Sequence, residues 1–413
     1  MIDINLLRKE PEKIKELILR KEPTFPVDKL IENDSCVKKL RTHIEELRKE
    51  KNNLAQAGAH GITPELREKS ISLDKKIKEQ EQELKNQEKE LESLALTVPN
   101  IPQEDLPVGG KEANKVIKEY GEKPKFSFNI KNHLELNEKL KWFDFQTAAI
   151  MSGTNFVLYK EMGVKIIYAL TRLMLKNNVS FGFTPILPPY LIHEKALYNS
   201  GNLPKFQGDY YNVNTDGLSL IPTAEVSLTN LHANSILSFE QLPLRYTSWT
   251  SCFRREAGTH GATERGLIRI HQFEKTEIYS ICVPEESNKE LEHMVICAQT
   301  LLQKLNLHYR ISLLATQDCS FPSSRTYDIE VWLPGQAQYY EVSSCSNCTD
   351  FQARRSLIRY RKTTDSKPTL VHTLNASSLA LPRLMVAIME TGQQKDGSIV
   401  LPDVLNEEIN KLW

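Results

Sequence analysis

The segment 252–277 holds the densest concentration of side chains that could do chemistry. It carries arginines, glutamates, a lysine and an aromatic residue around a glycine-rich polar stretch, and two runs able to form strands flank that stretch. We therefore predict a β-hairpin with a long tip. Because side chains alternate along a strand, Arg254 and Glu256 would share one face. Phe273 and Glu277 would share one face of the return strand, with a lysine between them.

These residue types suit a nucleotide and an amino acid together. A guanidinium carries fixed donors that match phosphate or carboxylate, an aromatic face can stack on a nucleobase, and a carboxylate can hold an ammonium or a hydroxyl. The alternative is a solvated hairpin with cross-strand ion pairs, which is the commoner outcome for a lone Arg/Glu pair. The number of matching groups in one string favours ligand binding.

This string resembles motif 2 of class II aminoacyl-tRNA synthetases in the seryl-tRNA synthetase form, FRxEAGxxG followed by RGLxRxHQFxKxE. Other stretches resemble the same family in the same order, and the resemblance covers nearly the whole chain. They are 182–190 for motif 1, whose proline lies at a dimer interface, 223–225 for the serine pocket, 341–344 for the metal and ATP strand, and 373–377 with Arg383 for motif 3.

The resemblance implies a role for each matched residue. Arg254 and Arg383 would be catalytic, and Glu341 and Ser344 would hold Mg²⁺ on the ATP phosphates, as the preference of hard cations for oxygen allows. Which pocket glutamate binds the serine ammonium and which its hydroxyl stays open. The implied ATP residues are Arg254, Arg255, Glu256, Phe273, Glu341, Val342, Ser343, Ser344 and Arg383. The implied serine residues are Thr223, Ala224, Glu225, Glu277 and Ser377.

Several of these residues have structural alternatives. Glu341 could pair with Arg354 or Arg355, Ser377 could cap a following helix, and Phe273 could be sheet core. Within the matched string we favour the functional interpretation.

Three departures from the family pattern lie in motif 3, where Ala376, Ser378 and Pro382 stand at positions usually held by glycine. Pro382 lacks an N–H and would kink a helix that began at Ser378. Either that helix starts later or Arg383 is aimed differently. The motif 2 loop also departs from the family pattern, with Thr and Glu at 263–264.

Two helices are predicted before residue 100. Apolar residues recur at steps of three and four in the first helix, and 58–61 interrupts the pattern. Thr63 and Pro64 are a typical N-cap and first helical residue for the second helix. We predict an antiparallel coiled-coil hairpin, the arm, over about 28–94. The seam residues of the first helix are Val37, Leu40, Ile44, Leu47 and Leu54.

The rest of the chain mixes helical stretches with short β-branched and aromatic runs. We therefore predict an α+β protein in which the helical arm is followed by a class II synthetase catalytic domain with a mainly antiparallel sheet flanked by helices. The predicted boundaries are 1–105 for an N-terminal tRNA-binding domain, 106–125 for a linker rich in Pro and Gly at its start, and 126–413 for the catalytic domain.

The 413 residues carry 53 basic and 53 acidic side chains, so a nucleic acid must be bound by a local patch. The arm is nearly neutral, and its charge alone favours a solvated coiled coil. Basic residues nevertheless crowd its first helix, and the resemblance implies that the arm grips serine tRNA. These predicted tRNA contacts are Lys38, Lys39, Arg41, Arg48, Lys49 and Lys51.

The seven cysteines are scattered, and the chain opens without a secretory leader, which favours a reducing cytoplasm. No stretch approaches eighteen apolar residues, so we expect no membrane span. Cys345 and Cys348 form one close pair and supply only two ligands, so we expect no structural zinc.

We therefore predict an ATP-dependent serine–tRNA ligase that forms seryl-adenylate and pyrophosphate and then esterifies tRNA(Ser). The resemblance adds a homodimer and, where the host has one, tRNA(Sec). Two alternatives stay open: a synthetase-like ligase that loads an amino acid onto a carrier protein, and a catalytically silent tRNA-binding paralogue. The paralogue would be expected to have lost some of Glu225, Arg254, Glu277 and Arg383, all of which are present.

Overall fold

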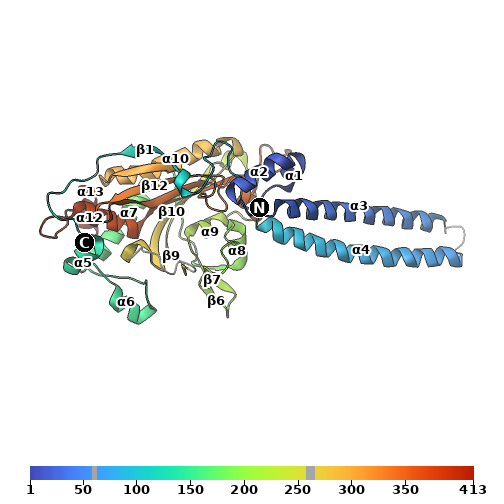
Figure 1. Cartoon of the computed structure of the whole chain (residues 1–413), viewed down its shortest axis with the longest axis horizontal. Helices are drawn as coiled ribbons and strands as arrows, with labels where there is room; N and C mark the ends of the chain where they lie inside the picture. The colour runs from blue at the N-terminus through green and yellow to red at the C-terminus, as the bar shows by residue number, and fades with distance from the viewer. Residues whose placement is uncertain (58–62, 257–265) are drawn as a thin grey trace. The chain divides into compact units, whose positions relative to one another are not determined.

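The computed structural model describes residues 1–57, 63–256 and 266–413, and the chain divides into two compact units, Met1–Pro99 and Asn100–Trp413. The first unit contains two long helices, α3 (Val27–Ala57) and α4 (Pro64–Leu96), which lie side by side and antiparallel (Figure 1). Two short helices, α1 (Ile4–Lys9) and α2 (Pro11–Lys21), precede them. The long helical pair confirms the predicted hairpin, and residues 58–62 between its helices lie outside the described part.

Apolar side chains hold the two long helices together. Val37 and Ile44 of α3 are buried, and Leu47 packs in one cluster with Leu73 and Ile77 of α4. Helix α4 begins as the sequence indicates, because the Thr63 side chain accepts a hydrogen bond from the Leu66 N–H at 3.3 Å and Pro64 follows in the first turn.

The second unit is built on an eight-stranded sheet (Figure 1). Its strand pairs are antiparallel except for the parallel pair β4–β9, which confirms the predicted α+β class. In sheet order the strands are β1 (Lys115–Tyr120), β11 (Tyr309–Leu313), β12 (Arg325–Leu333), β13 (Gln338–Asn347), β16 (His372–Ala380), β10 (Gln272–Cys282), β9 (Leu244–Phe253) and β4 (Thr184–Pro185).

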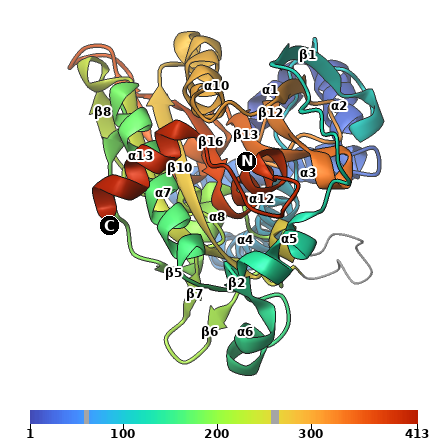
Figure 2. The same cartoon turned by 90° about the vertical axis from the view of Figure 1, so that its left-hand side faces the viewer.

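Four helices build the main core with this sheet: α7 (Met162–Ser180), α10 (Ser287–Lys304), α12 (Leu381–Gly392) and α13 (Asp403–Leu412) (Figure 2). Ile278 of β10 belongs to that core, whereas Tyr279 and Ile281 pack in a second cluster with α9 (Ala224–Thr229) and α11 (Phe351–Ser356). Since side chains alternate along β10, Glu277 lies on the Tyr279 face, away from the main core.

The remaining elements are short and surround the sheet. They are α5 (His133–Leu140), β2 (Phe143–Asp144), α6 (Phe145–Ser152), β3 (Leu158–Tyr159), β5 (Leu191–His193), α8 (Glu194–Ser200), β6 (Asn212–Val213), β7 (Leu218–Leu220), β8 (Ile236–Ser238), β14 (Arg359–Arg361), β15 (Thr369–Leu370) and the 3₁₀ turns η2 (Lys111–Ala113), η3 (Phe239–Gln241), η4 (Gly266–Ile268), η5 (Pro284–Glu286) and η6 (Pro334–Gln336). In the described ranges no helix has both the length and the apolar content to cross a bilayer.

The segment 106–125, predicted as a linker, contains the edge strand β1. Lys115–Tyr120 pairs antiparallel with β11, and all six of its side chains are exposed. A strand with no buried face needs no alternation of apolar and polar residues, so no local pattern indicates this strand. This part of the segment is therefore sheet.

Two β-bulges lie in the centre of the sheet. Opposite β12, Ile329 pairs with Ser343 and Glu330 with Glu341, so that Val342 is an extra residue in β13. Opposite β10, Thr276 pairs with Leu379 and Glu277 with Ser377, so that Ser378 is an extra residue in β16. An extra residue shifts the alternation by one position, and residues three apart then share a face.

Pro382 lies in the first turn of α12, which begins at Leu381. A proline fits there because the first N–H groups of a helix have no intrahelical partner. Of the two possibilities left open by the sequence, the structure has the later helix start: β16 continues through Ser378 to Ala380. Ser377 is accordingly a strand residue and does not cap the helix.

Candidate active site

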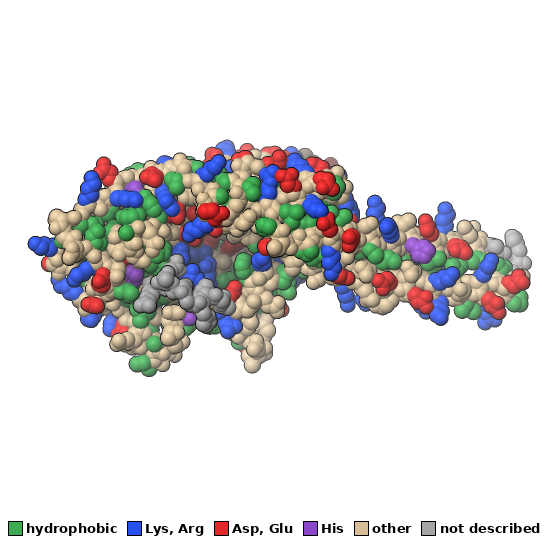
Figure 3. Space-filling view, viewed as in Figure 1, with side chains coloured by type: hydrophobic (Ala, Val, Ile, Leu, Met, Phe, Trp, Pro, Cys, Tyr) green, Lys and Arg blue, Asp and Glu red, His purple; other side chains and the backbone are tan. Residues whose placement is uncertain are grey.

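A cavity of about 170 Å³ opens beside the bulged strands. Figure 3 shows a hollow on the second unit, with Lys and Arg side chains inside it. Several residues predicted from the sequence line the cavity, although they come from four different segments of the chain. They are Arg254, Glu256, Phe273, Glu341, Ser377 and Arg383.

The predicted hairpin forms one wall. Phe273 pairs in register with Cys252, and the Arg254 guanidinium carbon lies 5.2 Å from the centre of the Phe273 ring. The Arg254 Nε donates to the Pro222 carbonyl at 3.3 Å, and no carboxylate among the described residues pairs with this guanidinium. A cation and an aromatic face are therefore presented together, which suits a phosphate attached to a base. The loop 257–265, with the unusual Thr and Glu, lies outside the described residues.

A buried carboxylate lies deeper in the same face. Glu277 is fully buried and pairs in register with Ser377. Its Oε2 accepts from the Thr223 hydroxyl at 3.0 Å and pairs with the Lys275 ammonium, whereas its Oε1 has no hydrogen-bond partner among the described residues. Since a buried acceptor without a donor is costly, Oε1 is poised to accept from a ligand.

Glu225 is the second pocket carboxylate. Its Oε1 accepts from the Gln352 amide at 2.7 Å and its Oε2 from the Asn375 amide at 3.1 Å. Burial, with the charge of Glu277 nearby, raises the pKa of Glu225 to about 7. Thr223 caps helix α9 by accepting from the Glu225 N–H at 3.2 Å, and Ala224 is buried behind it.

The oxygen atoms that could hold a metal lie in an adjoining cavity of about 470 Å³. The bulge at Val342 turns Glu341 and Ser344 to the same face, and both line this cavity beside Asp328. One Asp328 oxygen is buried without a hydrogen-bond partner among the described residues, and burial together with Glu341 raises the pKa of Asp328 well above its usual range. Three oxygen-bearing side chains fit a hard cation shared with a phosphate.

Within the described ranges, no group of three or more His, Cys, Asp and Glu side chains is arranged to hold a metal on its own. Arg383 lies between the two cavities and donates from Nη1 to the Glu341 carbonyl at 2.7 Å. Its Nη1 is also 3.7 Å from Glu341 Oε2, so that Glu341 faces Arg383. Arg354 instead pairs with Asp350.

Three predicted ATP residues point away from both cavities. Arg255 donates from Nη1 to the Gly208 carbonyl at 3.2 Å. Val342 is buried in the main core, and the Ser343 hydroxyl donates to the Ser377 carbonyl. Any contact of Val342 or Ser343 with a ligand must therefore use their main chain.

The structure adds residues that the sequence analysis did not assign to the site. Lys275 is buried in the cavity wall, Arg269 lines both cavities and pairs with Glu256 at 2.8 Å, and Gln352 and Asn375 hold Glu225. The alternation of Phe273, Lys275 and Glu277 was the signal for Lys275. Nothing in the local sequence indicates that Gln352 reaches Glu225.

The predicted basic patch of the arm divides into two groups. Arg41 pairs with Glu88 at 2.6 Å, Arg48 with Glu81 at 2.7 Å, and Lys51 with Asp74, in each case across the two helices. The other three lysines are exposed and form no ion pair with any described residue. They are Lys38, Lys39 and Lys49.

Comparison with known proteins matches both units. Residues 207–392 match the tRNA synthetase class II core domain (G, H, P, S and T), and residues 1–102 match the seryl-tRNA synthetase N-terminal domain. A serine–tRNA ligase of Chlamydia pneumoniae is 44% identical over 421 residues, covering 100% of this chain and 98% of that relative. One from Dehalococcoides mccartyi strain 195 is 42% identical over 407 residues, covering 98% of both.

Two solved structures are similar along almost the full length. Seryl-tRNA synthetase from Pyrococcus horikoshii, solved with ATP, has a TM-score of 0.94 at 35% identity and covers 99% of this chain and 98% of that chain. The cytoplasmic serine–tRNA ligase of Naegleria fowleri, solved with AMP, has a TM-score of 0.88 at 26% identity, with coverage of 99% and 97%.

Proposed function

The chain belongs to the seryl-tRNA synthetase family, and from that premise we propose that it is a serine–tRNA ligase that uses ATP. One observation carries the proposal: among the described residues, the Arg254 guanidinium has no carboxylate partner and faces the Phe273 ring, and the buried Glu277, on the same face of β10 as that ring, has one oxygen without a hydrogen-bond partner. The relatives match the arm as well as the core, which favours this function over a carrier-protein ligase or a silent paralogue.

In the first step, a serine carboxylate oxygen attacks the α-phosphorus of ATP, forming the acyl phosphate bond and releasing pyrophosphate. The substrate supplies its own nucleophile, so the protein must mainly neutralise developing charge. Arg254 and Arg383 are the residues we assign to that task. Mg²⁺, held by Glu341 and Ser344, would neutralise charge on the phosphates.

Serine recognition is assigned to the deeper pocket. Oε1 of Glu277, which has no hydrogen-bond partner among the described residues, accepts a hydrogen bond from serine, and Ser377, opposite it in register, contributes a hydroxyl. Glu225 adds negative charge near the serine ammonium. A pocket that hydrogen-bonds the serine hydroxyl rejects alanine strongly, because its buried polar groups are left unpaired.

In the second step, the 3′-terminal hydroxyl of the tRNA attacks the adenylate and releases AMP. We assign tRNA binding to the arm, with tRNA(Ser) as substrate and tRNA(Sec) where the host has one. Because Arg41, Arg48 and Lys51 form ion pairs within the arm, we assign the phosphate contacts to the exposed Lys38, Lys39 and Lys49.

A homodimer and a cytoplasmic location complete the proposal. Leu187, in the stretch similar to motif 1, is 73% exposed, and Tyr168 of the preceding helix is 49% exposed, which supports a subunit contact there. The cytoplasm holds tRNA and is a reducing compartment in which the six buried free cysteines persist as thiols.

The test is ATP–pyrophosphate exchange by purified protein with serine, threonine and alanine in separate reactions, followed by transfer to tRNA(Ser). The proposal expects serine-dependent exchange and charging. Exchange without charging would point to another acceptor. Folded protein that exchanges with none of the three amino acids would overturn the enzymatic function.

A further inference from the structure

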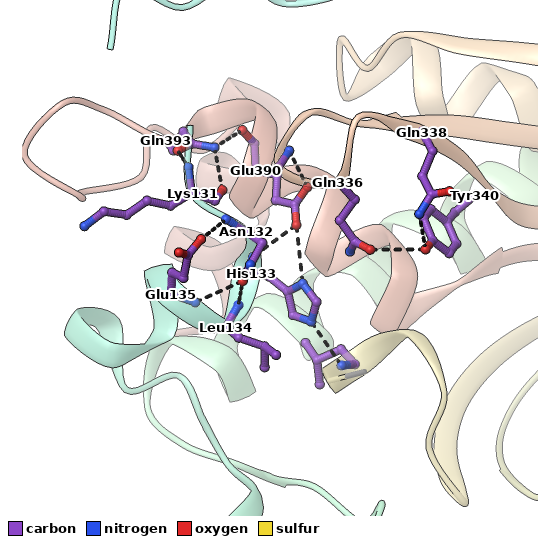
Figure 4. A network of polar contacts seen from close by, with 12 residues as sticks. Lys131, Asn132, His133, Leu134, Glu135, Gln336, Gln338, Tyr340, Glu390 and Gln393 are labelled. Atoms are coloured by element: carbon purple, nitrogen blue, oxygen red, sulfur yellow. Dashed lines mark hydrogen bonds and ion pairs between the residues drawn. The ribbon is translucent and has the colours of Figure 1, made fainter. Parts of the chain in front are cut away.

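A buried histidine and a buried glutamate meet between α5 and α12, outside the cavity (Figure 4). His133 is 2% exposed and Glu390 fully buried. Glu390 Oε1 accepts from the His133 main-chain N–H at 3.0 Å and lies 3.3 Å from its ring Nδ1, while Oε2 accepts from the Gly335 N–H at 2.9 Å. The charge of Glu390 is therefore matched by three donors in the interior.

The other ring nitrogen of His133 reaches the turn η4. The Leu267 N–H donates to His133 Nε2 at 3.3 Å. Because Nε2 accepts this hydrogen bond, it carries no proton, and the ring proton lies on Nδ1, where it faces Glu390. Glu390 thus fixes the neutral tautomer in which His133 can hold Leu267, in the way that carboxylates orient metal-ligating histidines.

Gly266 lets the turn approach the imidazole. It has a φ of +71°, and a Cβ at this position would lie 2.2 Å from His133 Nε2. The next two residues, Leu267 and Ile268, are buried in the main core and line the cavity that holds Arg254 and Phe273. A displacement of this turn therefore changes the cavity wall directly.

Helix α12 reaches the same turn once directly and once through His133. The Arg383 Nε lies 3.4 Å from the Ile268 carbonyl, to which it donates, and Glu390 contacts His133, which holds Leu267. The two α12 residues are seven apart, about two helical turns, so they lie on one face. One face of α12 thus carries both Arg383, the proposed ATP contact, and Glu390, which supports the turn Gly266–Ile268 through His133.

We propose that His133 and Glu390 are positioning residues that hold the turn Gly266–Ile268 in register with Arg383, and thereby shape the ATP site. This inference rests on the proposed use of ATP. It adds a pair of residues that contact no substrate and act through Leu267.

Two substitutions of His133 separate its two ring contacts. In H133Q the side-chain oxygen can take the place of Nε2 and accept from Leu267, whereas in H133N the side chain is too short and reaches only Glu390. We expect H133N to raise the KM for ATP in pyrophosphate exchange about tenfold, with the serine KM within about twofold. H133Q should restore most of the ATP affinity.

A matched control removes a nearby contact that does not involve Leu267. The Gln393 side chain accepts a hydrogen bond from the Lys131 N–H at 2.8 Å and donates one to the Lys131 carbonyl at 3.0 Å. Q393A removes both hydrogen bonds. Q393A should lower thermal stability while leaving the ATP KM unchanged. If H133N does not fold, G266A makes the same test from the turn side, because its Cβ would displace the imidazole.

Hydrogen exchange at the Leu267 amide reports the turn without any enzymatic activity, so this inference and the proposed function can fail separately. We expect faster exchange in H133N and near-native exchange in H133Q. Unchanged Leu267 exchange in H133N would overturn the inference. So would faster exchange with an unaltered ATP KM, because the pair would then be structural only.

Discussion

Opposite charges pair in both units of this molecule, but in different surroundings. In the arm, Arg48 and Glu81 pair at 2.7 Å with side chains that are 59% and 43% exposed. In the sheet, Lys275 and Glu277 pair with side chains that are 8% and 0% exposed. Water screens the first pair, so it contributes little to stability, whereas loss of one partner from the second leaves an uncompensated buried charge.

This difference separates structural charges from functional ones. On the arm, pairing engages half of the predicted basic patch and leaves three exposed lysines for a partner. In the catalytic unit, pairing orients Glu277 and leaves Arg254 for an anion. On the arm, the cations that we assign to tRNA have no ion-pair partner among the described residues. In the catalytic unit this holds for Arg254, whereas Glu277, Glu341 and Arg383 are assigned to ligands although each has an ion-pair partner. The four predictions below test this division, beginning with the largest expected effect.

Neutralising the buried carboxylate should nearly abolish serine activation. E277Q keeps the shape of the side chain but removes its negative charge and replaces one of its two acceptor oxygens with an NH₂ donor, so that Lys275 and the ligand no longer both have an acceptor. We expect serine-dependent pyrophosphate exchange to fall about 10³-fold. The control is E274Q, three residues earlier on the opposite face of β10, where Glu274 accepts from the Ser251 hydroxyl. Equal losses in the two variants would contradict the assignment.

Serine affinity should rise with pH around neutrality. The pKa of Glu225 is about 7, and its ionised form adds negative charge to a pocket that also contains Glu277, Lys275 and Arg254. An ammonium ligand favours the ionised form, so binding releases a proton below pH 7 and the serine KM falls as pH increases. We expect a drop of about tenfold between pH 6 and 8, measured by exchange.

The matched variant for this pH dependence is E225Q, which cannot titrate. Its serine KM should be higher than that of the native protein at pH 8 and nearly constant over the same range. A native serine KM that is flat between pH 6 and 8 would contradict the role given to Glu225.

On the arm, the exposed and the paired cations should differ in their effect on tRNA. K38A/K39A should raise the KM for tRNA(Ser) about fivefold and reduce its dependence on salt, because phosphate contacts are lost. The matched double variant R41A/R48A removes the same charge from residues that already pair within the hairpin, and should change this KM less than twofold. Pyrophosphate exchange without tRNA serves as the common control. If the two double variants had the same KM for tRNA(Ser), ion pairing within the arm would not decide which cations bind the tRNA.

The smallest effect is expected for the stability of the arm. R48A should lower the free energy of unfolding by about 0.2–1 kcal/mol, because the pair with Glu81 is exposed on both sides. L47A in the buried seam, one residue away, should cost about 2–5 kcal/mol. Urea denaturation monitored by circular dichroism measures both values. A larger loss in R48A than in L47A would reverse the comparison.

The sequence predicts those parts of the fold in which a repeating pattern meets a buried surface. The arm seam and the hairpin around Arg254 are of this kind, and both are found. β1 escaped prediction because none of its side chains is buried. The two bulges escaped because pairing across strands creates them, and no local pattern around Val342 or Ser378 marks the extra residue.

The site residues divide in the same way, into those that a local sequence pattern indicates and those that only the tertiary fold brings together. The family resemblance indicated Glu341, Ser344 and Ser377, but strict alternation would have turned Ser344 away from Glu341. The support for Glu225 comes from Gln352 and Asn375, which are 127 and 150 residues away in the chain. Such contacts follow from the tertiary fold and carry no local signal.

The bulge at Val342 also limits how this chain can change in length. Loss of the bulge with all residues kept would turn Ser344 to the face opposite Glu341, whereas deletion of the extra residue would leave the two positions two apart in a regular strand and still on one face. A one-residue insertion or deletion between Glu341 and Ser344 must therefore be accompanied by the gain or loss of a bulge if both side chains are to reach the cavity. Sequences that keep this function should therefore have either a three-residue interval from Glu341 to Ser344 with a bulge or a two-residue interval in a regular strand.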